Sequence, residues 1–161
     1  MHASALGLPA SGSCTCSKVR GLARRLTGLY DAALAPHGLT VTQYAALATI
    51  AHLVASIPIA ELARRLQMDR TTTSRLVGPL ETEGLVTRVD ASKSHCDVRA
   101  RPLKLTAKGR RRLAEALPAW QAAQRDLEAI LGEGLSTRLH RATEAATRAL
   151  VAASIEPTEP M

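Results

Sequence analysis

The residues that could carry chemistry lie together in one short stretch, 69–75, which reads Asp-Arg-Thr-Thr-Thr-Ser-Arg. Four hydroxyl side chains stand between two arginines there. Hydroxyl groups can bond phosphates and base edges, and an arginine can bind guanine through two hydrogen bonds in the major groove. Serine and threonine are also ordinary residues at the start of a solvent-exposed helix, so the neighbouring elements must decide between these interpretations. The candidate contacts are Arg70, Thr71, Thr72, Thr73, Ser74 and Arg75.

This stretch opens a predicted helix. Asp69 suits the N-cap position, apolar residues follow at helical spacing, and Gly84 stands where the helix should stop. Residues 59–68 predict a shorter amphipathic helix just upstream, with only a few residues between the two. Two short helices joined by a tight turn, the second basic and rich in hydroxyls, are typical of a helix-turn-helix.

A β-hairpin is expected after the second helix. Residues 85–90 are rich in strand-forming side chains, 91–97 are polar, and apolar residues alternate within 98–106. Residues 56–59 predict a short strand that completes the sheet at its edge, because Pro58 cannot donate to a ladder. The fold class predicted is therefore mainly α with a small β wing, a winged helix-turn-helix.

Composition and charge narrow the classes of function. The chain has 161 residues, 46% of them hydrophobic, and a formal net charge of +7. Residues 61–112 hold 13 Lys and Arg against 6 Asp and Glu, so the whole positive excess lies on the winged segment, as phosphate binding would require. The sequence contains no run of 18 apolar residues, so we expect no membrane-spanning helix. Residues 1–13 lack a charged start and are interpreted as a tail instead of a signal peptide.

Six short motifs, in order and at characteristic spacing, resemble the MarR family of bacterial transcription regulators. The likeness is strongest over about 39–110, and the helices predicted on either side fit the same family. The resemblance implies a regulator, by family default a repressor, that binds a pseudo-palindromic DNA operator as a homodimer in the bacterial cytoplasm, associated with the nucleoid. The motifs are residues 38–44, 59–63, 69–75, 80–86, 97–99 and 103–109.

Helices outside the winged segment carry more apolar surface than a small winged domain can bury. They are predicted at 17–35, 106–131 and 135–153, besides an inner helix at 42–53, and Pro118 should kink the second of them. The family resemblance assigns the outer helices to a two-fold dimer interface; a monomeric helix bundle is the alternative. The predicted organisation is 1–13 disordered tail, 14–40 N-terminal dimerisation helix, 41–106 winged DNA-binding region, 107–155 C-terminal dimerisation helices and 156–161 tail.

The wing departs from the family pattern. Six residues separate Asp90 from Asp97, where two are usual, so the tip should be long. The resemblance implies that Asp97 pairs with Arg99 and that basic residues near the tip enter the minor groove. The candidate wing contacts are Lys93 and His95 at the tip, with Arg99 and Arg101 on its flank.

Cys14 and Cys16 precede the first predicted helix, and a third cysteine, Cys96, lies in the wing. A structural disulfide is unexpected in a cytosolic protein, whereas a Cys-x-Cys pair suits a soft metal or redox chemistry. Cys16 and Tyr30 also match the hydroperoxide-sensing branch of the family. The two further tyrosines of that branch would fall at Arg20 and Val41 and are missing.

Three interpretations of the signal therefore stay open. Cys14, Cys16 and Tyr30 could form a thiol sensor of oxidants, electrophiles or a soft metal, or the cysteines could have no role. Alternatively, as is common in the family, an apolar or phenolic anion could fill a cleft. The histidines show no metal-ligand spacing, so we expect no cofactor apart from that soft-metal alternative. The cleft residues considered are Arg24, Tyr30, His37 and Tyr44.

The sequence contains no nucleophile elbow, phosphate loop, zincin or paired-carboxylate pattern, so an enzyme is not expected. The alternative from a different class is a winged helix that binds proteins and has no sequence-specific affinity for DNA. Such a module has no reason to keep a cluster of cations on its second helix and wing, namely Arg70, Arg75, Lys93, Arg99 and Arg101.

Overall fold

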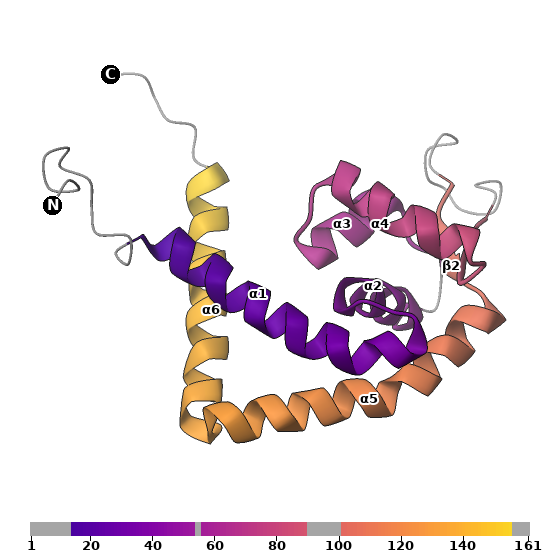
Figure 1. Ribbon diagram of the computed structural model, residues 1–161. Helices are drawn as coiled ribbons and strands as arrows, with labels where there is room; N and C mark the ends of the chain where they lie inside the picture. Colours follow the sequence, from indigo (N-terminus) through magenta and orange to yellow (C-terminus); the bar gives the residue numbers. More distant parts are fainter. Residues whose placement is uncertain (1–13, 54–55, 90–100, 156–161) are drawn as a thin grey trace, which may run out of the picture. The chain divides into compact units, whose positions relative to one another are not determined.

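The computed structural model describes residues 14–53, 56–89 and 101–155. The chain divides into two compact units, residues 1–121 and 122–161, which are described separately. In the described residues no helix is both long and apolar enough to cross a membrane. Figure 1 shows the elements, which are α1 (Thr15–Leu34), the 3-10 turn η2 (Ala35–His37), α2 (Val41–Ala51), α3 (Ile59–Leu66), α4 (Arg70–Thr82), β1 (Val86–Arg88), β2 (Leu103–Leu105), α5 (Ala107–Leu131) and α6 (Glu133–Ile155).

Helices α3 and α4 form the predicted helix-turn-helix. Leu62 and Ala63 are the buried face of α3, and the helix ends at Gln67, which adopts a left-handed conformation with φ of 54°. Met68 N then donates to Ala63 O at 2.9 Å, which satisfies one of the last carbonyls of α3. The tight turn therefore depends on a non-glycine residue at positive φ, where a side chain is ordinarily disfavoured.

The predicted cap of α4 is confirmed. The Asp69 carboxylate accepts from Thr72 N at 2.8 Å, so one of the unpaired amides of the first turn is satisfied. Val77 and Leu80 are fully buried and fix the inward face of the helix. At the other end Gly84, with φ of 69°, reverses the chain where the sequence predicted a stop.

Within the described residues, the sheet is smaller than the sequence predicted. Strands β1 and β2 pair antiparallel, with Val86 opposite Leu105 and Arg88 opposite Leu103. The strand expected at 56–59 is wrong in extent, because only Ile57 bridges to Leu103, through two backbone hydrogen bonds of 2.8 Å. Pro58 is already the N-cap of α3, so the chain leaves the sheet after a single residue.

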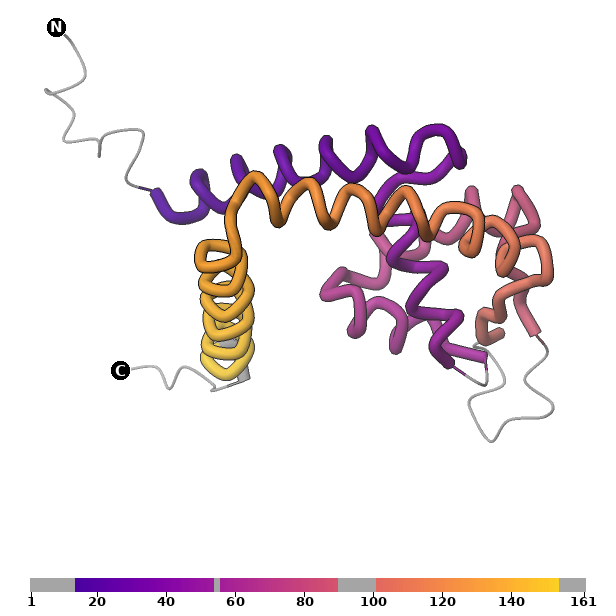
Figure 2. Tube along the Cα trace, turned by 90° about the horizontal axis from the view of Figure 1, so that it is seen from below, coloured from indigo at the N-terminus to yellow at the C-terminus, as the bar shows by residue number. Residues whose placement is uncertain are grey.

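The core of the first unit lies where α2 meets the winged elements and the first half of α5. Thr40 caps α2 in a capping box with Gln43, and the helix starts at Val41, one residue before the predicted start. Tyr44 stacks on Trp120 with ring centroids 5.7 Å apart, which joins α2 to α5. Figure 2 traces the backbone of both helices. The main buried apolar residues are Leu34, Leu47, Ile50, Ile57, Leu62, Val77, Leu80, Leu85, Val86 and Leu103.

The outer helices have nearly the predicted limits. α1 starts at Thr15, two residues before the predicted start, and α6 extends two residues beyond each predicted end. Pro118 lies inside α5, which continues on both sides of it. Gly132, with φ of 71°, separates α5 from α6 in the second unit.

Candidate nucleic-acid interface

The first two turns of α4 present the residues predicted to contact DNA, with one exception. Arg70, Thr71, Thr72, Ser74 and Arg75 are exposed, whereas Thr73 is completely buried. Its hydroxyl donates to Asp69 O at 2.9 Å, as a threonine commonly does to the carbonyl four residues earlier. Thr73 therefore packs α4 onto the domain, and its inclusion among the DNA contacts was wrong for this conformation.

Thr72 is exposed but already engaged. Its hydroxyl donates to Asp69 Oδ2 at 2.6 Å, in addition to the backbone bond at the cap. These hydrogen bonds from Thr72 lower the pKa of Asp69 below its ordinary value. Because the hydroxyl proton is used, Thr72 can accept from a base amino group but cannot donate to a phosphate while the cap is intact.

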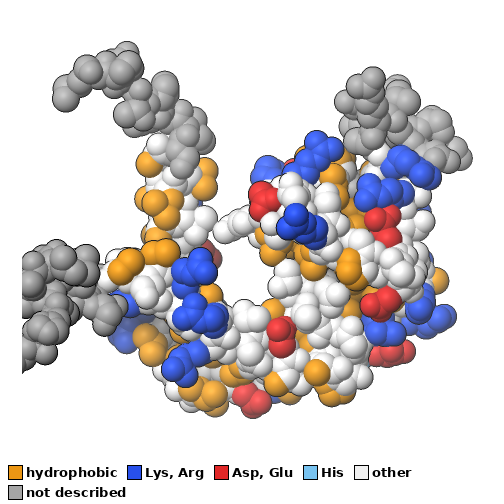
Figure 3. All heavy atoms as spheres, turned by 45° about the horizontal axis from the view of Figure 1, so that its top comes forward, with side chains coloured by type: hydrophobic (Ala, Val, Ile, Leu, Met, Phe, Trp, Pro, Cys, Tyr) orange, Lys and Arg blue, Asp and Glu red, His pale blue; other side chains and the backbone are white. Residues whose placement is uncertain are grey.

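Arg70 and Arg75 are the free cations of α4. Both are exposed, and neither has a hydrogen-bond or ion-pair partner within the part of the chain that the structure describes. Uncompensated guanidinium groups next to exposed hydroxyls are well suited to phosphates and to the guanine edge. Figure 3 shows Lys and Arg side chains gathered over the face that carries α3 and α4.

A second basic group lies on α3 and was missed by the sequence analysis. Glu61 accepts from Arg64 Nε and Nη2 and from Arg65 Nε, each at 2.7 Å. The hydrogen bonds from Arg64 and then Arg65 lower the pKa of Glu61 to about 2, so the carboxylate stays charged at neutral pH. The triad keeps a net positive charge on the helix that, in a helix-turn-helix, crosses the DNA backbone.

Much of the predicted wing interface cannot be compared with the structure. Lys93, His95 and Arg99 lie outside the described residues, as does the proposed Asp97 pairing. Arg101 is exposed two residues before β2. At the base of the wing, Arg88 Nε and Nη2 donate to the two carboxylate oxygens of Glu81 at 2.9 and 3.0 Å, which ties β1 to α4.

Cys14 and Cys16 are free thiols, both exposed. Cys14 is the N-cap of α1, and Cys16 lies within the first turn instead of before the helix as expected. Tyr30 is half-buried 14 positions further along the same helix, about 21 Å away at 1.5 Å per residue, so it cannot contact Cys16 in one chain. The described residues contain no group of three or more His, Cys, Asp or Glu that could hold a metal.

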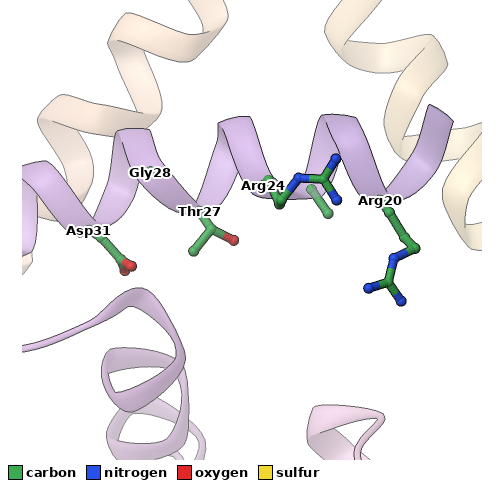
Figure 4. Close-up of a pocket in the computed structure, with 6 residues that line it drawn as sticks. Arg20, Arg24, Thr27, Gly28 and Asp31 are labelled. Atoms are coloured by element: carbon green, nitrogen blue, oxygen red, sulfur yellow. The ribbon is translucent and has the colours of Figure 1, made fainter. Parts of the chain in front are cut away.

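The described residues of the first unit line two pockets that bear on ligand binding. One, of about 570 Å³, follows one face of α1 and has two arginines at one end and a carboxylate at the other (Figure 4). The other, of about 400 Å³, lies between α2 and α5. The first is lined by Arg20, Ala23, Arg24, Thr27, Gly28 and Asp31, and the second by Tyr44, Ala48, Ala51, His52, Arg110, Leu113, Ala114 and Leu117.

The four cleft residues expected from the sequence are therefore not brought together. Arg24 lines the first pocket and Tyr44 the second, while Tyr30 and His37 line neither. Burial raises the pKa of Tyr44, so its hydroxyl remains a donor at neutral pH. Asp31, at the end of the first pocket, accepts from Val41 N at 2.7 Å and thereby links α1 to the start of α2.

Comparison of the sequence and structure with known proteins identifies similar transcriptional regulators. A family model described as MarR family matches residues 37–95. The Mycobacterium tuberculosis transcriptional regulator MosR, solved in complex with DNA, is 35% identical, with a TM-score of 0.77 over 88% of this chain and 98% of that one. No curated protein matches the sequence.

Two other solved structures are similar in fold. The transcriptional repressor CouR of Rhodococcus jostii, bound to a 23-mer DNA duplex, is 25% identical with a TM-score of 0.66, over 90% of this chain and 99% of that one. PcaV of Streptomyces coelicolor, a regulator in complex with its natural ligand, is 19% identical with a TM-score of 0.76, over 89% and 98%. The likeness to PcaV concerns the fold alone.

Proposed function

Because the chain belongs to the MarR family of transcriptional regulators, we propose that it represses transcription by binding a pseudo-palindromic operator as a homodimer. The observation that carries the proposal is the exposed start of α4, where Arg70 and Arg75 have no partner in the described structure. The DNA complex of MosR and the DNA complex of CouR support duplex DNA as the partner. The protein would act in the cytoplasm, associated with the nucleoid.

In this proposal α4 enters the major groove and supplies the sequence-specific contacts. Arg75 is the sixth residue of α4 and its side chain is exposed. We assign it to a contact with a base edge or a nearby phosphate. Arg64 and Arg65 on α3 are assigned to the backbone, because they are exposed and carry more charge than Glu61 neutralises. Wing residues would add minor-groove contacts.

A homodimer is proposed because both units expose large apolar side chains. Val19 and Leu22 are exposed on α1, and Leu135, Leu150 and Val151 are exposed on α6. A single chain would leave this surface in water, whereas an isologous interface buries the same residues twice. Two copies would present two α4 helices to half-sites about 10 bp apart, one turn of B-DNA.

We propose that a ligand in the α1 pocket releases the operator. Arg20 and Arg24 can pair with a carboxylate or another anion, and Ala23 and Gly28 offer an apolar wall. The complex of CouR with p-coumaroyl-CoA supports an organic effector.

Modification of Cys14 or Cys16 is the second route of release that we propose. Both thiols are exposed at the start of α1, so oxidants, electrophiles and soft metals can reach them from solvent. A cross-link, an oxidised sulfur or a soft metal there would alter a helix of the proposed dimer interface. Tyr30 could join Cys16 only across that interface.

The proposal is tested with duplexes selected from a random pool. Sedimentation at micromolar protein should give a dimer, and footprinting of the selected duplex should protect two half-sites about one turn apart. A monomer in sedimentation, or protection of a single half-site, would exclude the dimer. If the pool yields no preferred duplex, the regulator proposal fails, and a winged helix that binds proteins becomes the better explanation.

A further inference from the structure

Glu61 on α3 is shared by two arginines, and its bonds fix the orientation of both. Arg64 Nε donates to Glu61 Oε2 and Arg64 Nη2 donates to Glu61 Oε1, each at 2.7 Å, so the carboxylate and the guanidinium pair through two bonds. Arg65 Nε donates to the same Oε1, also at 2.7 Å. One carboxylate therefore holds the guanidinium groups of two adjacent residues.

These bonds determine which donors remain for a phosphate. A guanidinium can bind an anion through two bonds either at its Nε–Nη2 edge or at its Nη1–Nη2 edge. Glu61 occupies the first edge of Arg64, so a phosphate can form two bonds to Arg64 only at the second edge. In Arg65 the Nε donor is taken as well. Both arginines are thus left with the Nη1–Nη2 edge for a two-bond contact with DNA.

The arginines remain accessible in spite of this pairing. The side chain of Arg64 is 72% exposed and that of Arg65 is 44% exposed, whereas that of Glu61 is 32% exposed. They lie on α3, which belongs to the face where Lys and Arg side chains gather in Figure 3. Hydrogen bonds from Arg64 and then Arg65 lower the pKa of Glu61 to about 2, so the carboxylate is charged whenever DNA binds near neutral pH.

The pairing affects the arginines more than it affects the stability of the helix. Exposed ion pairs at a spacing of three and four residues stabilise a helix only slightly. A free arginine samples many conformations, and a held one loses less entropy when it meets a phosphate in the matching position. A phosphate in any other position must first displace the guanidinium from Glu61, or approach the carboxylate. The pairing therefore favours one register of phosphate contacts over the others.

We propose that Glu61 is a positioning residue for sequence-specific binding, which holds Arg64 and Arg65 for phosphates in the register set by the base contacts of α4 and weakens their contacts with random DNA. This inference rests on the proposed function and adds a residue that determines its specificity. Glu61 itself needs no contact with DNA. An acidic side chain on a DNA-binding face thus increases discrimination between sequences while it lowers total affinity.

The test removes the charge of Glu61 and keeps the size of its side chain. Glu61→Gln is compared with Glu115→Gln, a control at an exposed position on α5 that changes the net charge equally. Both substitutions are also made in a background with Arg64→Gln and Arg65→Gln, which leaves α3 without an arginine. The midpoint of thermal unfolding of each variant reports whether the stability has changed.

The affinities for a selected duplex and for a scrambled duplex are measured over a range of salt concentrations. Glu61→Gln should raise the affinity for the scrambled duplex about tenfold near about 150 mM salt, and should steepen its logarithmic salt dependence by about 1 for each copy of the chain, because each copy gains about one phosphate contact. The affinity for the selected duplex should rise by about threefold or less, since the held arginines already meet phosphates there. The ratio of the two affinities should therefore fall about threefold or more.

Glu115→Gln should leave the ratio unchanged, as should Glu61→Gln in the background without Arg64 and Arg65. An unchanged ratio in the simple Glu61→Gln variant overturns the inference. A fall that persists without the two arginines also overturns it, because the carboxylate then acts as a local charge.

If the wild-type protein prefers no duplex, the proposed function fails, and elution from heparin, a sulfated polyanion, decides the inference separately. Glu61→Gln should then need more salt for elution than Glu115→Gln, but only while Arg64 and Arg65 are present. Equal elution of these two variants would overturn the inference.

Discussion

Gly109→Ala should destabilise the protein strongly for a reason that can be worked out from distances. The added Cβ would lie 2.0 Å from Leu85 O and 2.9 Å from the carbonyl carbon of the same residue. Leu105 Cδ1, at 2.8 Å, can rotate away, but the backbone of Leu85 cannot. To reach even 3.0 Å, the distance below which real Cβ atoms essentially never approach another atom, the start of α5 must retreat by about 1 Å.

A retreat of that size breaks the hydrogen bonds that hold the start of α5 against the end of α4. The bond from the Thr106 hydroxyl to Gly84 O would stretch from 2.7 Å to about 3.7 Å, beyond hydrogen-bond range. Losing this bond and the one from Thr106 N to Leu85 O costs about 1 kcal/mol each. Remaining overpacking adds about 1–3 kcal/mol, and the helix preference of alanine returns at most about 1 kcal/mol. We expect a net loss of about 2–4 kcal/mol.

Gly78→Ala is the matched control. It is the same substitution, inside α4, and a Cβ there meets no atom within 4 Å. It should raise the free energy of unfolding by about 0.5–1 kcal/mol, because alanine loses less backbone entropy in a helix. Urea unfolding of both variants measures the difference. Equal effects of the two substitutions would refute the steric argument.

Three other predictions follow from the site. Arg75→Ala should cost about 1–3 kcal/mol of binding to a selected duplex, and an unchanged preference over random DNA would exclude a reading role. Hydrogen bonds from Thr72 lower the folded-state pKa of Asp69, so the charged cap stabilises the fold above the unfolded-state pKa and loses this contribution as the pH falls through the folded-state pKa. As the pH falls below about 5, the free energy of unfolding of wild type should therefore decrease more than that of Asp69→Asn. Urea unfolding at several pH values measures both, and parallel pH profiles of the two proteins would contradict this prediction. Cys16→Ser should keep duplex affinity under mild peroxide that weakens wild type, and equal loss in both proteins would end the thiol-sensor proposal.

The helices and strands could be predicted because the residues that define their ends and faces lie close together in the sequence. Asp69 and Gly84 lie within a few residues of the helix ends they define, and both caps are confirmed. The alternation of Leu103 and Lys104 likewise placed β2. Such patterns depend on backbone geometry within one or two turns, which the sequence contains directly.

Two of the failures, at Thr73 and at the pockets, concern interactions that sequence patterns do not encode. Thr73 looked like its neighbours in a hydroxyl-rich run, and only the orientation of α4 on the core buries it. Arg64 and Arg65 were counted as charges, but pairing with a shared Glu61 could have been suggested by their spacing of three and four. The pockets needed the tertiary structure, because Arg24 and Tyr44 belong to helices that turn them toward different spaces.

The most direct test of the central claim is the binding of a selected duplex at two salt concentrations. Neutralising phosphates with the cations of α3, α4 and the wing releases counterions, so affinity should fall by about 10³-fold or more between about 50 and 200 mM salt. The preference for the selected duplex over a scrambled one should persist at the higher salt, because base contacts are less sensitive to counterions than phosphate contacts. Absence of duplex binding at the lower salt, or equal affinity for the two duplexes throughout, would contradict the account.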